Sequence, residues 1–341
     1  IDKFAKEHRE IIKKHKFRQF IFFRQWSGLK EYAQSLGIQI IGDIPIFAAH
    51  DSADVWAKPE LFFMDGKGNP TVVAGVPPDY FSATGQMWGN PLYNWQIHKQ
   101  NGFSWWKERL KVLLKTVDII RLDHFRGFAG YWEIPADAEN AMEGEWKPGP
   151  GEDFFFAIEE ELGELPILAE DLGEITPDVI ELRDKFDFPG MKIMVFAFDS
   201  DASNEFLPHN YTTNNVVYTG THDNDTSLGW YQRVNEGERD FVRRYLARSG
   251  KDISWSLIRE AWKSVAMFSI APMQDLLNLD NQARMNYPSN PRGNWQWRIP
   301  QNALNDFIKS RMLEMNILYK RHGWMEWATE ITPSETPGYF K

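Results

Sequence analysis

Cysteine is absent from this chain of 341 residues. Within this sequence, that absence excludes disulfide bonds, catalytic thiolates and cysteine-ligated zinc. It is compatible with a reducing compartment, and the cytoplasm is therefore our default expectation. The sequence also lacks an uninterrupted apolar run of the roughly 18 residues that suggest a membrane-spanning helix, so we expect no membrane-embedded segment.

An excess of positive charge is also missing, because the formal net charge is −10. Nucleic acids and anionic membrane surfaces attract basic proteins, so neither is an expected partner. No HExxH motif or comparable ligand spacing is present, and a metal site is not favoured. A Gly-rich phosphate loop is missing too, which argues against a sugar-phosphate enzyme.

Three acidic residues follow apolar runs at the point where each run becomes abruptly polar. They are Asp123 in VDIIRLDHFRG, Glu170 in LPILAEDLGE and Asp223 in NVVYTGTHDND. Such runs are typical of buried parallel strands. In a parallel barrel of strands and helices, the catalytic groups lie at the carboxyl ends of the strands. The pattern therefore predicts an active site built from three strand ends.

The spacing of these acids agrees with that interpretation. Each interval exceeds the roughly 30 residues that a strand with its crossover helix requires. The second interval also contains the apolar run 191–200, which fits a further strand. Side chains two positions apart on a strand share a face, so Arg121 should point the same way as Asp123. A cation in that position favours the ionised carboxylate.

The remaining pattern alternates between helical and strand-like segments, with three long loops rich in Gly, Pro, Asn and aromatic residues. We expect helices within 1–36, 103–116, 154–163, 176–187, 227–265 and 302–322. We expect strands at 38–47, near 118, near 166, at 191–200, near 215 and at 269–277. We expect loops at 48–96, 131–153 and 278–300.

Six strands are two short of a closed eightfold barrel. The predicted fold is α/β, a (β/α)8 TIM-type barrel with long inserted loops, whose first two strands would precede this chain. An open parallel sheet is the structural alternative. We expect one catalytic domain over 1–341, with insertions at about 48–115 and 224–265.

Two acids are what cleavage of a glycosidic bond requires. One donates a proton to the leaving oxygen, and the other traps or stabilises the oxocarbenium-like centre. Asp123, held as an anion by Arg121, suits the second role. Burial would raise the pKa of Glu170 and suit it to the first. Spacing alone does not assign the roles.

Several motifs together resemble one family. They are RLDHFRG, AEDLG, THDNDT, GDIPIF, PPDYFSATGQMWGNPLY and ARMNYPSNPRGNWQWR. The sequence is similar to the amylomaltases or disproportionating enzymes, the 4-α-glucanotransferases of glycoside hydrolase family 77, over essentially its whole length. The last two motifs narrow the match to this family rather than to the wider α-amylase clan.

The resemblance implies a role for each acid. Asp123 would be the nucleophile, Glu170 the acid and base, and Asp223 the transition-state stabiliser. It implies a retaining double displacement through a glucosyl-aspartate intermediate, an α-1,4-glucan donor and a sugar acceptor, and no metal or organic cofactor. It also implies that family members begin with about two more strands than this chain shows.

Further residues are candidates for sugar binding, each with a plainer structural alternative. Loop aromatic rings can stack on pyranose faces, whereas most of the 15 Trp residues must serve packing. His222 is favoured as a substrate contact, His124 is left open, and Asp171 is expected to cap a helix or to form a structural pair. The candidate binding residues are Arg121, His222, Asp79, Tyr80, Phe81, Trp88, Phe196, Asn286 and Asp43, and Arg284 lies in the same late loop as Asn286.

Three functions compete at this point. The first is a transferase that moves α-1,4-glucan segments between maltooligosaccharides, in starch or glycogen metabolism. The second is an α-amylase-like hydrolase, which shares the chemistry but releases free reducing ends without disproportionation. The third is a catalytically silent glucan-binding protein, which the presence of all three acids and Arg121 disfavours.

Overall fold

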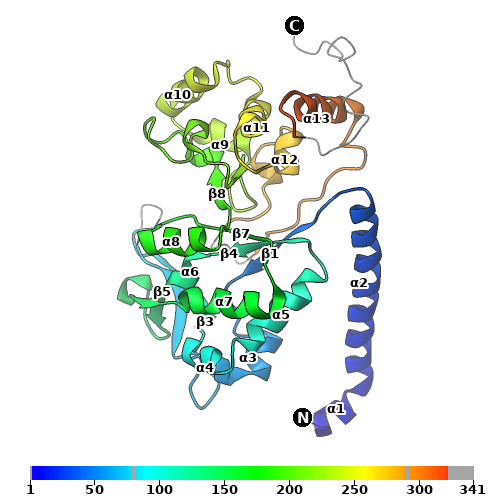
Figure 1. The fold of residues 1–341 in the computed structure, drawn as a ribbon, viewed down its shortest axis with the longest axis vertical. Coiled ribbons are helices and arrows are strands. Elements are labelled where there is room, and N and C mark those ends of the chain that lie inside the picture. Colours follow the sequence, from blue (N-terminus) through cyan, green and yellow to red (C-terminus); the bar gives the residue numbers. More distant parts are fainter. Residues whose placement is uncertain (1, 79–81, 289, 291, 322–341) are drawn as a thin grey trace. The chain divides into compact units, whose positions relative to one another are not determined.

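The structure is a computed structural model that describes residues 2–78, 82–288, 290 and 292–321. The chain divides into two compact units, Ile1–Phe188 and Pro189–Lys341. Each unit combines parallel strands with helices (Figure 1). Over the described residues, no helix has the length and apolar character needed to cross a membrane.

Three parallel strands form the sheet of the first unit. β4 (Ile119–Asp123) pairs with β1 (Ile41–Pro45) on one side and with β7 (Ile167–Ala169) on the other. The first four residues of β4 are buried, as the apolar run predicts. β1 is shorter than the expected 38–47. It ends at Pro45, which has no amide hydrogen to continue a ladder.

Helices connect these strands. They are α5 (Ser104–Leu114), α6 (Arg126–Ala129), α7 (Gly151–Leu162) and α8 (Pro177–Lys185). An ion pair of 3.3 Å between Lys107 and Glu161 joins α5 to α7, which run close to each other in Figure 1. Beneath them, Phe128, Phe154 and Phe155 are fully buried and in mutual ring contact. The expected helices 103–116, 154–163 and 176–187 are therefore confirmed.

A second, antiparallel sheet corrects two of the expected loops. Its order is β3 (Gln86–Pro91), β2 (Val72–Val76), β5 (Gly130–Pro135) and β6 (Glu145–Pro148). Short helices α3 (Ala53–Ala57) and α4 (Trp95–Gln100) lie in the same segment as β2 and β3. These strands contain Gly and Pro, which interrupt the alternation of apolar and polar residues by which strands are identified in a sequence. At Gly75, a side chain would collide with the Gln86 carbonyl, 2.1 Å from its β-carbon position.

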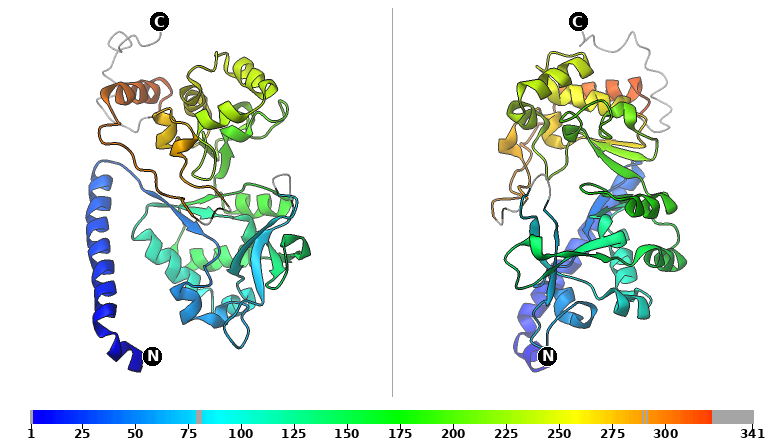
Figure 2. Two further views of the ribbon diagram at one scale, coloured as in Figure 1. Left: turned by 180° about the vertical axis from the view of Figure 1, so that it is seen from behind. Right: turned by 90° about the vertical axis from the view of Figure 1, so that its left-hand side faces the viewer.

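The chain opens with α1 (Asp2–Glu7) and the 27-residue α2 (Arg9–Ser35), as expected for 1–36. None of the residues of α2 is buried. The helix is joined to the end of α5 near its own C-terminus, where Trp26 Nε1 donates to the Thr116 carbonyl at 2.7 Å. Lys30 Nζ donates to the Val117 carbonyl at 2.7 Å. Figure 2 shows α2 from two further sides.

The second unit has its own run of parallel strands, with β9 (Asn215–Tyr218) between β8 (Gly190–Ile193) and β10 (Phe268–Ile270). Its helices are α9 (Ser227–Arg233), α10 (Glu236–Leu246), α11 (Ile253–Lys263), α12 (Met273–Leu276) and α13 (Asp306–Leu318).

Two strands of the second unit are shorter than predicted. The apolar run 191–200 leaves the sheet after Ile193 and continues as the 3-10 turn Met194–Phe196. The run 269–277 is a strand only to Ile270, and α12 begins after Pro272. Proline is compatible with the start of a helix but not with a continuing central strand.

Candidate active site

Arg121 is held between two carboxylates at the end of β4. In the strand register it lies opposite Asp43 of β1, and its guanidinium pairs with that carboxylate. It also pairs with Asp123 at 3.0 Å, from Nη2 to Oδ1. Arg121 is buried, whereas both acids reach solvent. The expectation that Arg121 and Asp123 point the same way is confirmed, and a fixed positive charge lies beside an accessible carboxylate.

Glu170 follows directly after β7, in register with the end of β4. Its amide donates to the Leu122 carbonyl at 3.1 Å, and its carbonyl accepts from the Phe125 amide at 3.0 Å. Burial, with the negative charge of Asp123 as the next cause, raises the pKa of Glu170 to about 8. Arg121 and the His124 amide, which donates to Oε2 at 2.7 Å, oppose that rise. Near neutral pH, Glu170 is therefore mainly a protonated acid able to donate a proton.

His124 lies between these two acids in sequence and in a strained backbone conformation, with a φ of +51°. Its ring is in edge-to-face contact with Trp88, with 4.8 Å between centroids, and it also approaches Phe47. Burial lowers the pKa of His124 to about 4, so the imidazole is neutral near pH 7. Trp88 keeps 39% of its surface exposed beside it, which leaves ring surface for a ligand.

In the second unit, Asp223 lies in the turn that follows β9. Asn286 Nδ2 donates to Asp223 Oδ1 at 2.5 Å, and His222 Nε2 lies 3.2 Å from Oδ2. The Asn286 amide also donates to the His222 carbonyl at 3.1 Å. His222 and Asn286 were both predicted from the sequence, and the structure brings both to Asp223.

Arg284 fixes the backbone of the same turn. Its guanidinium donates to the Asp223 carbonyl and pairs with the buried carboxylate of Asp225, which Arg233 contacts at 2.7 Å. Trp295 packs on His222 with 5.0 Å between ring centroids. Asp225 and Trp295 were not singled out from the sequence. They lie inside the THDNDT and ARMNYPSNPRGNWQWR motifs, and membership of these motifs was the only sequence signal for a role at the site.

A fully buried carboxylate lies beneath this turn. Asp275 of α12 accepts from the Thr219 hydroxyl at 2.5 Å, and from the Ser227 amide and hydroxyl at 2.8 and 2.7 Å. Thr219 and Ser227 bracket the segment that carries Asp223. Burial raises the pKa of Asp275, and these three donors oppose the rise. Sequence reasoning placed this residue in an apolar strand and did not single it out.

The remaining candidates have different outcomes. Asp79, Tyr80 and Phe81 lie outside the described residues. Phe196 lies in the 3-10 turn after β8 rather than on the strand, with its ring edge-to-face on Phe206. Asp171 pairs with Arg183 at 2.5 Å, which confirms its expected structural role.

Among the residues described, 2–78, 82–288, 290 and 292–321, no group of three or more acids and histidines could hold a metal ion. Asp123 and Glu170 lie in the first unit, and Asp223 with its partners lies in the second.

A carboxylic acid with a raised pKa together with a second carboxylate is the pair that proteins acting on glycosidic bonds use. Comparison with known proteins identifies the family. Residues 1–304 match the model of the 4-alpha-glucanotransferase family, glycoside hydrolase family 77, and the chain belongs to that family. The resemblance inferred from the motifs is confirmed.

Curated relatives agree with this assignment. The 4-alpha-glucanotransferase of Thermus thermophilus is 53% identical over 314 residues, covering 90% of this chain and 63% of its own length. That of Synechocystis is 53% identical over 311 residues, covering 90% and 62%. A chloroplastic/amyloplastic enzyme of Arabidopsis thaliana is 47% identical over 308 residues, covering 89% and 54%. The chain thus spans less than two thirds of the length of these relatives.

Solved structures confirm the predicted fold class. An amylomaltase from Streptococcus agalactiae, in complex with acarbose, matches with a TM-score of 0.92 and 42% identity. The match covers 94% of this chain and 66% of that one. An amylomaltase from Corynebacterium glutamicum, at 17% identity and a TM-score of 0.68 over 87% of this chain and 47% of that one, shows the fold alone.

Proposed function

We propose that this chain carries the catalytic residues of a 4-α-glucanotransferase, which transfers α-1,4-glucan segments between maltooligosaccharides. Family membership supports the activity. The single observation that supports the chemistry is that two acids of the first unit have different surroundings. Glu170 has a pKa of about 8, and Asp123 lies beside the Arg121 guanidinium. One acid is ready to give a proton while the other is ready to attack.

In the first step of the proposed double displacement, an Asp123 carboxylate oxygen attacks the anomeric carbon of the donor. The glycosidic C–O bond breaks, and Glu170 transfers its proton to the departing 4-oxygen. This leaves a glucosyl ester on Asp123 and an ionised Glu170. Because attack comes from the face opposite the leaving group, the first step inverts the anomeric centre.

In the second step, Glu170 acts as a base. It removes the proton from the 4-hydroxyl of an acceptor sugar, whose oxygen displaces Asp123 from the anomeric carbon. A second inversion restores the α-configuration, and both acids return to their starting states. Transfer requires that the acceptor sugar outcompete water at this stage.

Asp223 is proposed to stabilise the oxocarbenium-like transition state. Arg284 and Asn286 support that role, since they fix the backbone and the carboxylate of Asp223. The proposed sugar contacts are Arg121, Asp43, His222, Trp88, Phe196 and Asn286, together with Asp79, Tyr80 and Phe81.

The wider setting is also a proposal. We infer one catalytic barrel domain over 1–341 with insertions at about 48–115 and 224–265. The partners are an α-1,4-glucan donor and a sugar acceptor in starch or glycogen metabolism, and neither a nucleic acid nor a membrane. The cytoplasm is the proposed location. An organic cofactor or metal has no place in the scheme.

Incubation of the full-length protein with maltotriose tests the proposal. Longer maltooligosaccharides appearing together with glucose are expected from transfer. Glucose and maltose alone would identify an α-amylase-like hydrolase, and unchanged maltotriose with retained glucan binding would identify a binding protein. Asp123→Asn should lower turnover by at least about a thousandfold while glucan binding persists. Unchanged turnover in that variant would remove Asp123 from the nucleophile role.

A further inference from the structure

The turn that follows β4 contains a residue in an uncommon backbone conformation. His124 has a φ of +51°, in the left-handed region that few residues other than glycine adopt. Phe125 returns to the right-handed helical region, with φ −52° and ψ −34°. Backbone strain of this kind persists only where the surrounding structure fixes it, and it is common at functional sites. The contacts of His124 therefore indicate what the strained turn does.

Two consecutive amides of this turn are directed at Glu170. The His124 amide donates to Glu170 Oε2 at 2.7 Å, and the Phe125 amide donates to the Glu170 carbonyl at 3.0 Å. Successive amides in a turn that combines left-handed and right-handed residues form a concave donor group that suits an anion. The turn that follows the strand of Asp123 thus contacts both the side chain and the backbone of the proposed acid.

The imidazole ring and the carbonyl of His124 are both held in place. Trp88 makes an edge-to-face contact with the ring, with 4.8 Å between centroids, and the Phe47 ring lies at 6.3 Å. Gly127 leaves room for the ring, because a β-carbon at that position would come within 3.2 Å of His124 Cδ2. The Gly127 amide donates to the His124 carbonyl at 2.9 Å. With the ring and the carbonyl fixed, the direction of the His124 amide is fixed as well.

The charges around Glu170 give this amide a specific effect. Burial raises the pKa of Glu170, as do the charge of Asp123 and, less strongly, that of Asp171. Arg121 and the His124 amide oppose that rise, because both favour the ionised carboxylate. The imidazole itself is uncharged near neutral pH, since burial lowers the pKa of His124 to about 4. His124 therefore acts on Glu170 through its backbone rather than through a charge on its ring.

We propose that His124 is a positioning residue, whose left-handed turn directs a backbone amide at the Glu170 carboxylate and so favours the ionised form that takes a proton from the acceptor sugar. This inference rests on the transfer mechanism proposed above. The residue type fits the role. Histidine adopts a positive φ more often than most residues do, and its ring supplies packing contacts that a glycine would lack.

Titration of the Glu170 carboxyl by NMR, in the full-length labelled protein, tests the inference without requiring activity. His124→Val and His124→Asn both remove the imidazole, but only asparagine tolerates a positive φ well. The valine variant should raise the titration midpoint of Glu170 by about one pH unit, because the ionised carboxylate loses a donor. The asparagine variant should raise it less. Equal shifts would overturn the role of the backbone turn, and no shift in either variant would overturn the positioning.

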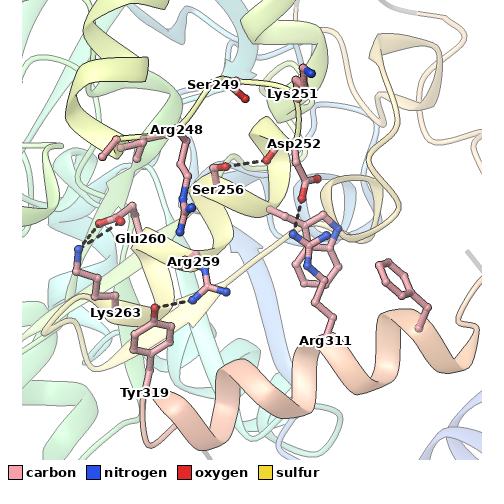
Figure 3. Close-up of a pocket in the computed structure, with 15 residues that line it drawn as sticks. Arg248, Ser249, Lys251, Asp252, Ser256, Arg259, Glu260, Lys263, Arg311 and Tyr319 are labelled. Carbon is pink, nitrogen blue, oxygen red and sulfur yellow. Dashed lines mark hydrogen bonds and ion pairs between the residues drawn. The ribbon is translucent and has the colours of Figure 1, made fainter. Parts of the chain in front are cut away.

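Two further variants control for folding. His124→Ala strains the turn less than valine does, and should give an intermediate shift even if the valine variant does not fold. Arg311→Gln breaks the ion pair between α13 and Asp252, the residue before α11, in the second unit (Figure 3). It should lower the melting temperature and leave the Glu170 midpoint unchanged. A shift as large as that of the His124 variants would show that lost stability alone moves the midpoint, and would overturn the inference.

The pH dependence of transfer separates this inference from the function on which it rests. The basic limb of kcat/KM reports the protonated acid of the free enzyme, so in the valine variant it should move upward together with the NMR midpoint. Transfer by the unchanged protein with no midpoint shift in the variants would refute the positioning alone. A midpoint shift in a protein without transfer activity would refute the proposed function and leave the positioning by His124 intact.

Discussion

The two units hold their candidate carboxylates by different means. In the first unit, Asp123 is the last residue of β4 and Glu170 directly follows β7, so backbone ladders position both. In the second unit, Asp223 lies five residues beyond the last residue of β9. Its carboxylate and carbonyl are held by Asn286 and Arg284, more than 60 positions further along the chain.

The difference between the units predicts which substitutions should affect each carboxylate. A carboxylate at a strand end depends on the buried sheet and on its immediate neighbours. A carboxylate in a turn depends on side chains that arrive from other elements, here α12 and the segment after it. We therefore expect few remote positions to affect the Asp123 and Glu170 pair, and several to affect Asp223.

Among the residues that support the three acids, Arg121 should have the largest effect on transfer when replaced by alanine, because two carboxylates share its charge. Transfer should slow by about 10²- to 10³-fold, the usual cost of losing one preorganised electrostatic partner. The free energy of unfolding should fall by about 2 kcal/mol, less than for a fully buried pair, since both acids reach solvent. Transfer rates and thermal unfolding measure the two effects.

Arg121→Lys is the matched control for this variant. It keeps the positive charge and loses the planar fork that contacts Asp43 and Asp123 together. An intermediate rate is expected. If the lysine and alanine variants were equally slow, geometry rather than charge would account for the role of Arg121.

Asp275→Ala tests the remote support of Asp223. The substitution leaves two hydroxyls and one amide without their buried acceptor, and should lower the free energy of unfolding by about 2 to 4 kcal/mol. Activity should also fall, because Thr219 and Ser227 bracket the turn that carries Asp223. Thermal unfolding and the transfer rate at 25 °C are the measurements. Asp275→Asn should show a smaller loss, and an unchanged melting temperature in both variants would contradict the proposed support.

Asn286→Ala removes one hydrogen bond to the Asp223 carboxylate. The expected result is a drop of about tenfold in transfer rate, the cost of one hydrogen bond to a charged group. Gln282→Ala, which removes an exposed amide from the same loop, is the control and should be neutral. If neither variant changed the transfer rate, Asp223 would not depend on that loop. That result would contradict the expected difference between the two units.

The smallest effect concerns the titration of Glu170. The charge of Asp123 contributes to raising the pKa of Glu170 to about 8, so Asp123→Asn should lower that pKa. Carboxyl NMR of the labelled protein measures the shift. Since the pKa lies above the ordinary 4.5, the stability that the protonated group supplies is complete below about pH 4.5 and is lost as pH rises toward 8.

Glu170→Gln should therefore gain in stability relative to the unchanged protein as pH rises from 4.5 to 8. Unfolding curves across that range provide the measurement. A constant difference at all pH values would show that Glu170 titrates normally in the folded state.

The contrast between the units also explains what could be predicted from sequence. Asp123 and Glu170 were identified because their apolar runs end abruptly, a local pattern. The antiparallel strands β2, β3, β5 and β6 were missed because Gly and Pro interrupt them and their pairing is set by distant partners. Asp275 was missed because a buried acid inside an apolar segment resembles a strand residue until Thr219 and Ser227 are seen beside it.

The motifs of the late loop did predict Asn286, although through resemblance to a family rather than through spacing.

Helix α2 has a consequence for motion within the first unit. Its described hydrogen bonds to the rest of that unit lie toward its C-terminus, at Trp26 and Lys30, while Ile11 and Phe17 in its first half are exposed. Tertiary contacts supply most of the stability of a helix in a protein. Backbone amides should therefore exchange with deuterium fastest at the start of α2 and progressively more slowly toward Trp26. The free energy of local opening should therefore increase along the helix from its start toward Trp26, and the helix should not open as one cooperative element.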